Sequence, residues 1–167
     1  FLSQQPSSGS SGQIWKTTDG GATWATITPP SAGNRRRILL ALDPEDENTL
    51  WAALPSAGNG NKIWKTTNSG NTWTNLTTSD LDSEAAHSIF WVGGTNGCIY
   101  YCSNQTVYYR DDNMANWTLH NQSLPLYFNS NIARPFYRDG MIRIASYGKG
   151  IWHSPLVIQP SYPIATI

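Results

Sequence analysis

The stretch Ile63-Trp64-Lys65-Thr66-Thr67-Asn68-Ser69-Gly70-Asn71-Thr72-Trp73 decides the fold of this chain, because it occurs twice. The first copy is Ile14-Trp15-Lys16-Thr17-Thr18-Asp19-Gly20-Gly21-Ala22-Thr23-Trp24, which lies 49 positions earlier (63 − 14). A near-identical run at a fixed offset indicates an internal repeat, and the rest of the chain is best examined for further copies.

Two weaker copies follow. Residues 107–112 lead to Trp117 at the same internal distance, and residues 151–154 repeat only the opening of the unit. The equivalent positions 14, 63, 107 and 151 are separated by 49, 44 and 44 residues (63 − 14, 107 − 63, 151 − 107). A period in the forties built from short strands is typical of β-propeller blades. Helical repeats of this length require apolar stripes with a 3.6-residue period, which are absent.

Strands are expected where runs of apolar or β-branched residues end at turn residues. The offset of 49 aligns residues 1–6 with residues 50–55, so the first unit begins at its second strand. The expected strands of the other units are 38–42, 49–54, 62–67 and 72–76, then 88–92, 98–103, 106–110 and 116–119, then 132–137, 141–146 and 150–155. The units thus hold three, four, four and three antiparallel strands. The predicted fold is an all-β propeller segment of about three and a half four-stranded blades.

Closed propellers have about four to eight blades. We therefore expect either the C-terminal part of a larger propeller or a chain that closes a ring with copies of itself. Residues 1–158 are assigned to the blades. Residues 159–167, which contain Pro160 and Pro163, are expected to form a linker to a following domain.

The two clear copies share the pattern Ser/Thr-x-Asp-x-Gly-x-x-Trp, with Asn in place of Asp in the second. This pattern suits a hairpin between blade strands three and four. The Asp or Asn side chain accepts backbone N–H bonds across the turn, Gly supplies a positive φ, and the Trp ring packs beside the turn. The residues are Thr17, Asp19, Gly21 and Trp24, then Thr66, Asn68, Gly70 and Trp73; a third copy retains only Asp112 and Trp117.

This pattern resembles the Asp-box, also called the BNR repeat, of sialidases, sortilin-type receptors and xyloglucan-degrading glycosidases. In those families the box is a fold element that usually lies away from the active site. The resemblance therefore implies a structural role for the ten residues above, and no catalytic residue is assigned among them.

The C-terminal stretch Tyr137-Arg138-Asp139-Gly140-Met141-Ile142-Arg143-Ile144-Ala145-Ser146-Tyr147-Gly148-Lys149-Gly150-Ile151-Trp152 is similar to the last propeller blade of large secreted proteins of Bacteroidota. In those proteins a β-sandwich module and a type IX secretion sorting domain follow the propeller. The resemblance implies an extracellular or outer-cell-surface location.

Composition narrows the range of partners. The chain has a formal net charge of zero and only 13% charged residues, which argues against a nucleic-acid partner. Arg35-Arg36-Arg37, the only basic run, is expected to be a solvated strand opening. No apolar run approaches the roughly 18 residues of a membrane span.

Catalytic and metal-binding patterns are weak. His87, His120 and His153 lack metal-ligand spacing, so neither a metal nor a cofactor is predicted. Cys98 and Cys102, four apart on one expected strand, are too distant for a disulfide and are expected to be buried free thiols. The carboxylates outside the repeated motif stand nearly all in turn contexts, namely Asp43, Glu45, Asp46, Glu47, Asp80, Asp82, Glu84, Asp111 and Asp139.

The leading functional hypothesis is a non-catalytic, secreted or surface-attached module for binding or scaffolding, with a glycan or a cell-surface protein as partner. The alternative is a segment of a glycoside hydrolase of sialidase or xyloglucanase type whose catalytic residues lie mostly outside it. A propeller that binds peptides in a central channel is a third hypothesis.

Overall fold

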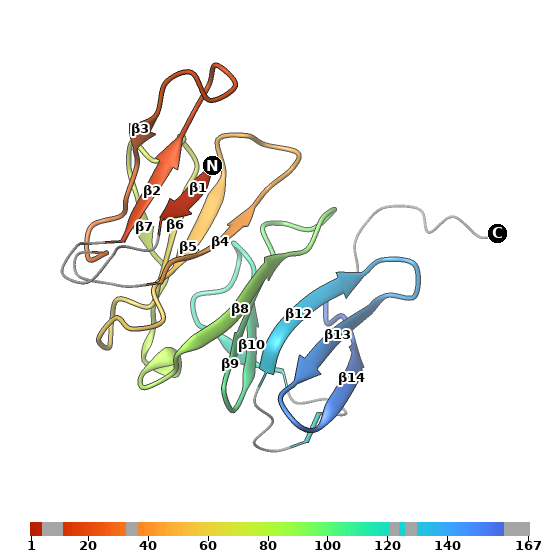
Figure 1. The fold of residues 1–167 in the computed structure, drawn as a ribbon. Helices are drawn as coiled ribbons and strands as arrows, with labels where there is room; N and C mark the ends of the chain where they lie inside the picture. Colours follow the sequence, from red (N-terminus) through yellow and green to blue (C-terminus); the bar gives the residue numbers. More distant parts are fainter. Residues whose placement is uncertain (5–11, 33–36, 121–123, 126–129, 159–167) are drawn as a thin grey trace. The chain divides into compact units, whose positions relative to one another are not determined.

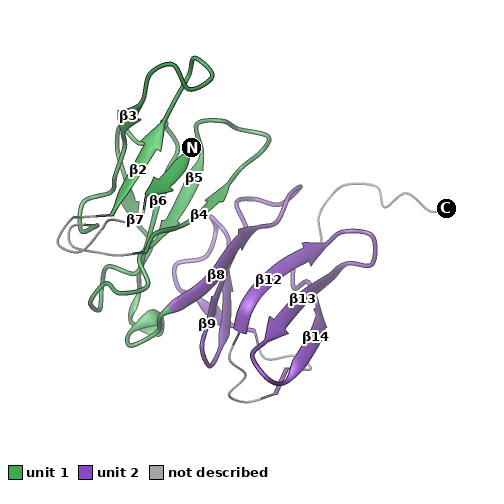
Figure 2. Ribbon diagram, in the orientation of Figure 1, with its two compact units in different colours: residues 1–85 green, residues 86–167 purple. Residues whose placement is uncertain are grey.

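The structure is a computed structural model that describes residues 1–4, 12–32, 37–120, 124–125 and 130–158. Residues 35 and 36 of the basic run and the linker expected at 159–167 lie outside the described residues. The chain forms two compact units, residues 1–85 and residues 86–167 (Figure 2), and each is described by itself.

The first unit contains two antiparallel sheets in which neighbouring strands are consecutive in sequence (Figure 1). The three-stranded sheet consists of β1 (Leu2–Gln4), β2 (Gln13–Lys16) and β3 (Ala25–Thr26). The four-stranded sheet consists of β4 (Leu39–Leu42), β5 (Leu50–Ala53), β6 (Ile63–Thr66) and β7 (Thr74–Asn75). A short 3₁₀ helix, η1 (Ser79–Leu81), follows β7.

The second unit repeats this organisation (Figure 1). Its four-stranded sheet consists of β8 (Ala86–Trp91), β9 (Ile99–Ser103), β10 (Val107–Arg110) and β11 (Thr118–Leu119). Its three-stranded sheet consists of β12 (Ser130–Phe136), β13 (Met141–Ser146) and β14 (Gly150–Pro155).

The predicted all-β class and the predicted sequence of three, four, four and three strands are confirmed. The helix η1 was not expected. The apolar run at 38–42 forms the edge strand β4, and Leu42 is 44% exposed. Strand β5, which has a neighbour on each side, is buried at all four positions.

The strand register refines the repeat. Trp15 faces Thr26 in the first sheet and Trp64 faces Asn75 in the second, so the offset of 49 holds for β2 and β3. In the strands before them, Leu2 faces Trp15 whereas Ala52 faces Trp64. Leu2 therefore corresponds to Ala52, an offset of 50 (52 − 2), because the connection from β1 to β2 is one residue longer than the connection from β5 to β6. The alignment of residues 1–6 with 50–55 was wrong by one position.

Each unit has its own apolar core. The core of the first unit joins its two sheets and includes Ile14 of β2, Ala52 of β5 and the largely buried Trp64 of β6. The core of the second unit includes Tyr100 of β9 and Ile142 and Ile144 of β13. In both units the sheets are held by packing of side chains from neighbouring blades, which leaves the loops and hairpins to carry polar groups.

Candidate functional site

In the first repeated hairpin, between β2 and β3, polar groups of the turn form hydrogen bonds with one another. Thr17 Oγ1 accepts a hydrogen bond from the Gly21 N–H at 2.8 Å, and Asp19 Oδ1 accepts one from the Thr23 N–H at 2.9 Å. The Thr23 hydroxyl donates to Asp19 Oδ2 at 2.6 Å. These bonds from Thr23, followed by one from Thr17, hold the pKa of Asp19 well below its ordinary value. The carboxylate is thus fixed as an acceptor inside its turn.

The second hairpin, between β6 and β7, builds the same geometry without the charge. Thr66 Oγ1 accepts from the Gly70 N–H at 2.9 Å, and Asn68 Oδ1 accepts from the Thr72 N–H at 2.9 Å. Asn68 Nδ2 then donates to Thr72 Oγ1 at 2.7 Å, where the first hairpin has a hydroxyl donating to a carboxylate. An amide therefore replaces the carboxylate, and the bond to the threonine hydroxyl reverses its direction: the hydroxyl donates in the first hairpin and accepts in the second.

The third hairpin, between β10 and β11, includes contacts that the first two lack. Arg110 Nη2 donates to the carbonyl oxygen of Met114 at 2.6 Å, and Asp111 Oδ1 accepts the N–H two residues on at 2.9 Å. The carboxylate of Asp112 lies against Gly97, since a Cβ on that glycine would be 2.5 Å from Asp112 Oδ2. The third hairpin thus adds bonds from Arg110 and to Asp111 that the first two hairpins do not have.

The three hairpin tryptophans differ in environment. Trp117 is buried, and Trp73 is partly buried with its Nε1 donating to the carbonyl oxygen of Ile27 at 2.8 Å. Trp24 is 44% exposed. Its Nε1 donates to the carbonyl oxygen of Gly21 at 3.1 Å, within its own turn.

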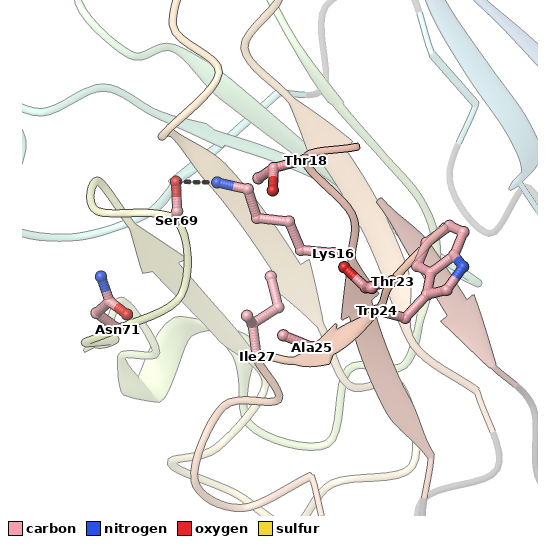
Figure 3. A pocket seen from close by; sticks show the side chains of 8 residues that line it. All are labelled: Lys16, Thr18, Thr23, Trp24, Ala25, Ile27, Ser69 and Asn71. Carbon is pink, nitrogen blue, oxygen red and sulfur yellow. Dashed lines mark hydrogen bonds between the residues drawn. The ribbon is translucent and has the colours of Figure 1, made fainter. Parts of the chain in front are cut away.

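A pocket of about 320 Å³ lies in the first unit between the first and second hairpins (Figure 3). Its lining combines one cationic side chain, hydroxyl and amide groups, and a few apolar groups, and it includes no carboxylate. The lining residues are Lys16, Thr18, Thr23, Trp24, Ala25, Ile27, Ser69 and Asn71. This volume is at the lower end of the roughly 300–1,000 Å³ of small-ligand sites.

One hydrogen bond joins the two hairpins at this pocket, and two more join the second hairpin to Asn48, in the turn between β4 and β5. Lys16 Nζ donates to Ser69 Oγ at 2.6 Å, as Figure 3 shows, and the Ser69 hydroxyl donates to Asn48 Oδ1 at 2.7 Å. The Ser69 N–H also donates to the Asn48 carbonyl oxygen at 2.9 Å, with Ser69 at φ +60°. Both the side chain and the backbone of Ser69 are therefore fixed, which presents a preorganised polar wall to the pocket.

Close packing below the pocket fixes the second hairpin. Gly70 adopts φ +87°, and a Cβ built on it would lie 2.4 Å from Cβ of Ile27. Only glycine allows both this backbone conformation and this approach. Together with the bond from Trp73 Nε1 to the Ile27 carbonyl oxygen, this contact joins the lining residue Ile27 to the second hairpin.

Several solved structures resemble the chain, among them the following three. It matches "YCF48 bound to D1 peptide" with a TM-score of 0.53 and 17% identity, over 86% of this chain and 43% of that one. It matches a GH74 enzyme of Niastella koreensis with a TM-score of 0.56 and 25% identity, over 83% of this chain and 22% of that one. An ancestral GH74 enzyme gives a TM-score of 0.62 and 18% identity, over 86% of this chain and 20% of that one.

These likenesses establish the fold. YCF48 and the GH74 enzymes are β-propellers, and the chain is a β-propeller segment of about three and a half four-stranded blades. It spans less than half the length of each of these structures. No protein-family model matches the chain, and no curated protein matches it.

The pocket was not predicted from the sequence. Gly70 and Trp73, which were assigned to the hairpin, contact the lining residue Ile27. Lys16, Ser69 and Asn71 were not proposed as site residues. The one signal in the sequence that could have pointed to Lys16 is the repeat, in which Lys16 and Lys65 hold equivalent positions. Lys65 lies over the ring of Trp51 with Nζ 5.0 Å from the centroid, whereas Lys16 lines a pocket.

Several of the turn carboxylates accept hydrogen bonds from residues of their own turn. Asp43 Oδ1 accepts the Glu45 N–H, and Asp46 accepts the Asn48 N–H and the Thr49 hydroxyl, the latter at 2.6 Å. The bond from Thr49 is the largest cause that lowers the pKa of Asp46. Carboxylates held in this way are acceptors within turns.

Among the described residues no group of three or more His, Cys, Asp and Glu side chains is placed to hold a metal ion. The same residues contain no helix with the length and hydropathy needed to cross a membrane. Cys98 and Cys102 are free and buried, and burial raises the pKa of Cys98 to about 12 and that of Cys102 also. Both thiols are therefore protonated near neutral pH.

His120 is the buried histidine. Its Nε2 lies 2.9 Å from Ser154 Oγ, its ring meets the edges of Tyr100 and Tyr109 in T-shaped contacts, and its Nδ1 has no hydrogen-bond partner in the described part of the chain. Burial lowers the pKa of His120 below its ordinary value of 6.5. The folded chain therefore holds the neutral imidazole.

This burial predicts an acid-sensitive second unit. Because the unfolded chain binds a proton near pH 6.5 and the folded chain does so only at lower pH, stability is full above 6.5 and is lost as pH falls. The slope approaches about 1.4 kcal/mol per pH unit between the two pKa values. Urea denaturation between pH 7.5 and 5 measures it. His120→Gln should flatten the slope and His153→Gln, at an exposed site, should keep it; parallel curves for wild type and His120→Gln would contradict the argument.

Proposed function

We propose that this chain is part of a secreted or cell-surface β-propeller module that binds a glycan or a protein and is not catalytic in this segment. The pocket between the first and second hairpins carries the proposal. Its walls are preorganised by the Lys16–Ser69–Asn48 hydrogen bonds, and a preorganised site loses less entropy on binding.

The lining favours a glycan over an apolar ligand. Thr18 and Asn71 present a hydroxyl and an amide, groups that both donate and accept hydrogen bonds and so match sugar hydroxyls. Ala25 and Ile27 supply the small apolar surface on which the C–H face of a sugar ring packs. The similarity to GH74 enzymes supports a carbohydrate-related role, and the peptide in the YCF48 structure supports protein recognition as the other form of the same proposal.

Within this proposal the hairpins are structural Asp-boxes. Thr17, Asp19, Thr66 and Asn68 hold the turns by the bonds described above, which supports that role. We propose that residues 1–158 are blades of a larger propeller or of an assembly of copies, that residues 159–167 link to a further domain, and that the protein is exported by the type IX route.

The alternative is a segment of a glycoside hydrolase whose catalytic carboxylates lie mostly outside it. The likeness to two GH74 enzymes favours it, with this chain spanning 22% and 20% of them. Release of reducing sugar by the full-length protein, abolished by a single carboxylate substitution, would make this alternative the better one.

Binding is tested on a glycan array with the 167-residue chain and its Asn71→Ala variant. Asn71 is exposed and lines the pocket, and the first repeat has Ala22 at its position, so the fold tolerates this change. The loss of one neutral hydrogen bond of about 1 kcal/mol should weaken binding roughly fivefold. Asn113→Ala, at an exposed site on the third hairpin, is the control. Absence of binding to any glycan, or equal loss in both variants, would refute glycan recognition at this pocket.

A further inference from the structure

Lys16 brings a charge without a counter-charge into the pocket. Its side chain is partly buried, its ammonium group donates to Ser69 Oγ, and its Nζ lies 5.7 Å from the centroid of the Phe1 ring. Among the described residues no carboxylate forms an ion pair with it. A hydroxyl and a ring face do not neutralise the charge of an ammonium group. Because Ser69 Oγ accepts one of its three N–H donors, two remain for a ligand.

The surroundings keep this charge near a ligand. The Ser69 hydroxyl that accepts from Lys16 is itself oriented by Asn48, so the ammonium group is held at a fixed place on the wall. Figure 3 shows the Lys16 side chain extended from β2 toward Ser69, with Thr18 beside it. A carboxylate bound there gains a charge-assisted hydrogen bond, which is roughly twice as strong as a neutral one.

We propose that the pocket binds an acidic sugar, with the carboxylate of a uronic acid residue on the Lys16 ammonium group. This inference rests on the proposed glycan-binding function and specifies its ligand class. Thr18 and Asn71 then meet the hydroxyls of the sugar, which an acidic peptide does not provide, and the small volume fits a single residue better than a folded partner.

The test is isothermal titration calorimetry of the 167-residue chain with trigalacturonate, a hyaluronan hexasaccharide, the methyl ester of trigalacturonate and triglutamate. We expect binding of at least one of the two uronic-acid oligosaccharides. The methyl ester keeps the hydroxyls of trigalacturonate but lacks its charge. If trigalacturonate binds, the affinity of the ester for the pocket should be at least about tenfold lower. Triglutamate should bind no more tightly than the ester.

Variants at two equivalent lysines complete the test. Lys16→Met should weaken binding of the acidic oligosaccharide about tenfold or more. It should weaken binding of neutral glycans far less, because they lose only the ordering of the wall by the bond to Ser69. Lys65→Met, the same change at the equivalent position of the second repeat, should leave both unchanged, with circular dichroism showing that each variant is folded.

The outcomes separate the two proposals. Binding of neutral glycans with none of the acidic oligosaccharides, or equal loss for neutral and acidic ligands in Lys16→Met, overturns the acidic-sugar inference and leaves the proposed function standing. Triglutamate binding as tightly as the uronic-acid ligand overturns the sugar assignment in favour of an acidic peptide. Failure of every glycan overturns both.

Discussion

Replacing Gly70 with alanine is expected to lower the free energy of unfolding by about 3–4 kcal/mol, the sum of backbone strain and overpacking. An L-residue at φ +87° is strained, and the new Cβ would lie 2.4 Å from Cβ of Ile27. The hairpin must move away from Ile27, which also breaks the bond from Trp73 Nε1. Urea denaturation of the variant measures the loss.

Gly20 supplies the matched control. It has φ +71°, a Cβ built on it meets no atom within 4 Å, and the second repeat has Ser69 at its position with φ +60°. Gly20→Ser therefore adds strain without a clash and should cost about 1 kcal/mol. Equal costs for Gly70→Ala and Gly20→Ser would show that the close approach to Ile27 is absent in solution.

The second large effect is expected for Tyr100→Ala, at about 4 kcal/mol. Tyr100 is fully buried in the second unit, where its ring stacks on Phe90 at 4.9 Å between centroids and meets His120 at 5.6 Å. Its hydroxyl accepts the N–H of Val157 at 2.9 Å. Removing the ring therefore leaves a cavity at the centre of the core and an unsatisfied N–H.

Two companions separate these contributions. Tyr100→Phe keeps the ring and should cost only about 1–2 kcal/mol, for the lost hydrogen bond. Tyr147→Ala, at a side chain that is 78% exposed, should change stability by less than about 0.5 kcal/mol. A cost for Tyr100→Ala no larger than that for Tyr100→Phe would mean that the stacked cluster contributes nothing.

The fold was predictable because its determinants are local. The repeat of Ile14 at Ile63, the turn bonds closed by Thr17 and Asp19, and the positive φ of Gly70 all involve residues within one hairpin or one period. The order of the strands along the chain follows from these. The strand bounds do not all follow, since β7 and β11 each span two residues within the expected ranges 72–76 and 116–119. The one-residue shift of β1 was missed because pairing across a loop depends on the loop's length as well as on the repeat.

The pocket was not predictable for the opposite reason. The bond from Lys16 to Ser69 spans 53 residues and exists only because Gly70 lets its hairpin pack on Ile27. The sequence shows equivalent lysines at 16 and 65, yet one lines a pocket and the other lies over the ring of Trp51. Their roles differ through neighbours in space, which a single sequence does not order.

The position of Ser69 has an evolutionary consequence. Each of the first two hairpins satisfies its turn through a Thr and an Asp or Asn. Both require only a left-handed backbone at the residue after the Asp or Asn, which is Gly20 in one copy and Ser69 in the other. That side chain is free to diverge after duplication while the scaffold persists. A duplicated blade can thereby acquire a new specificity by changing one residue at the tip of its hairpin.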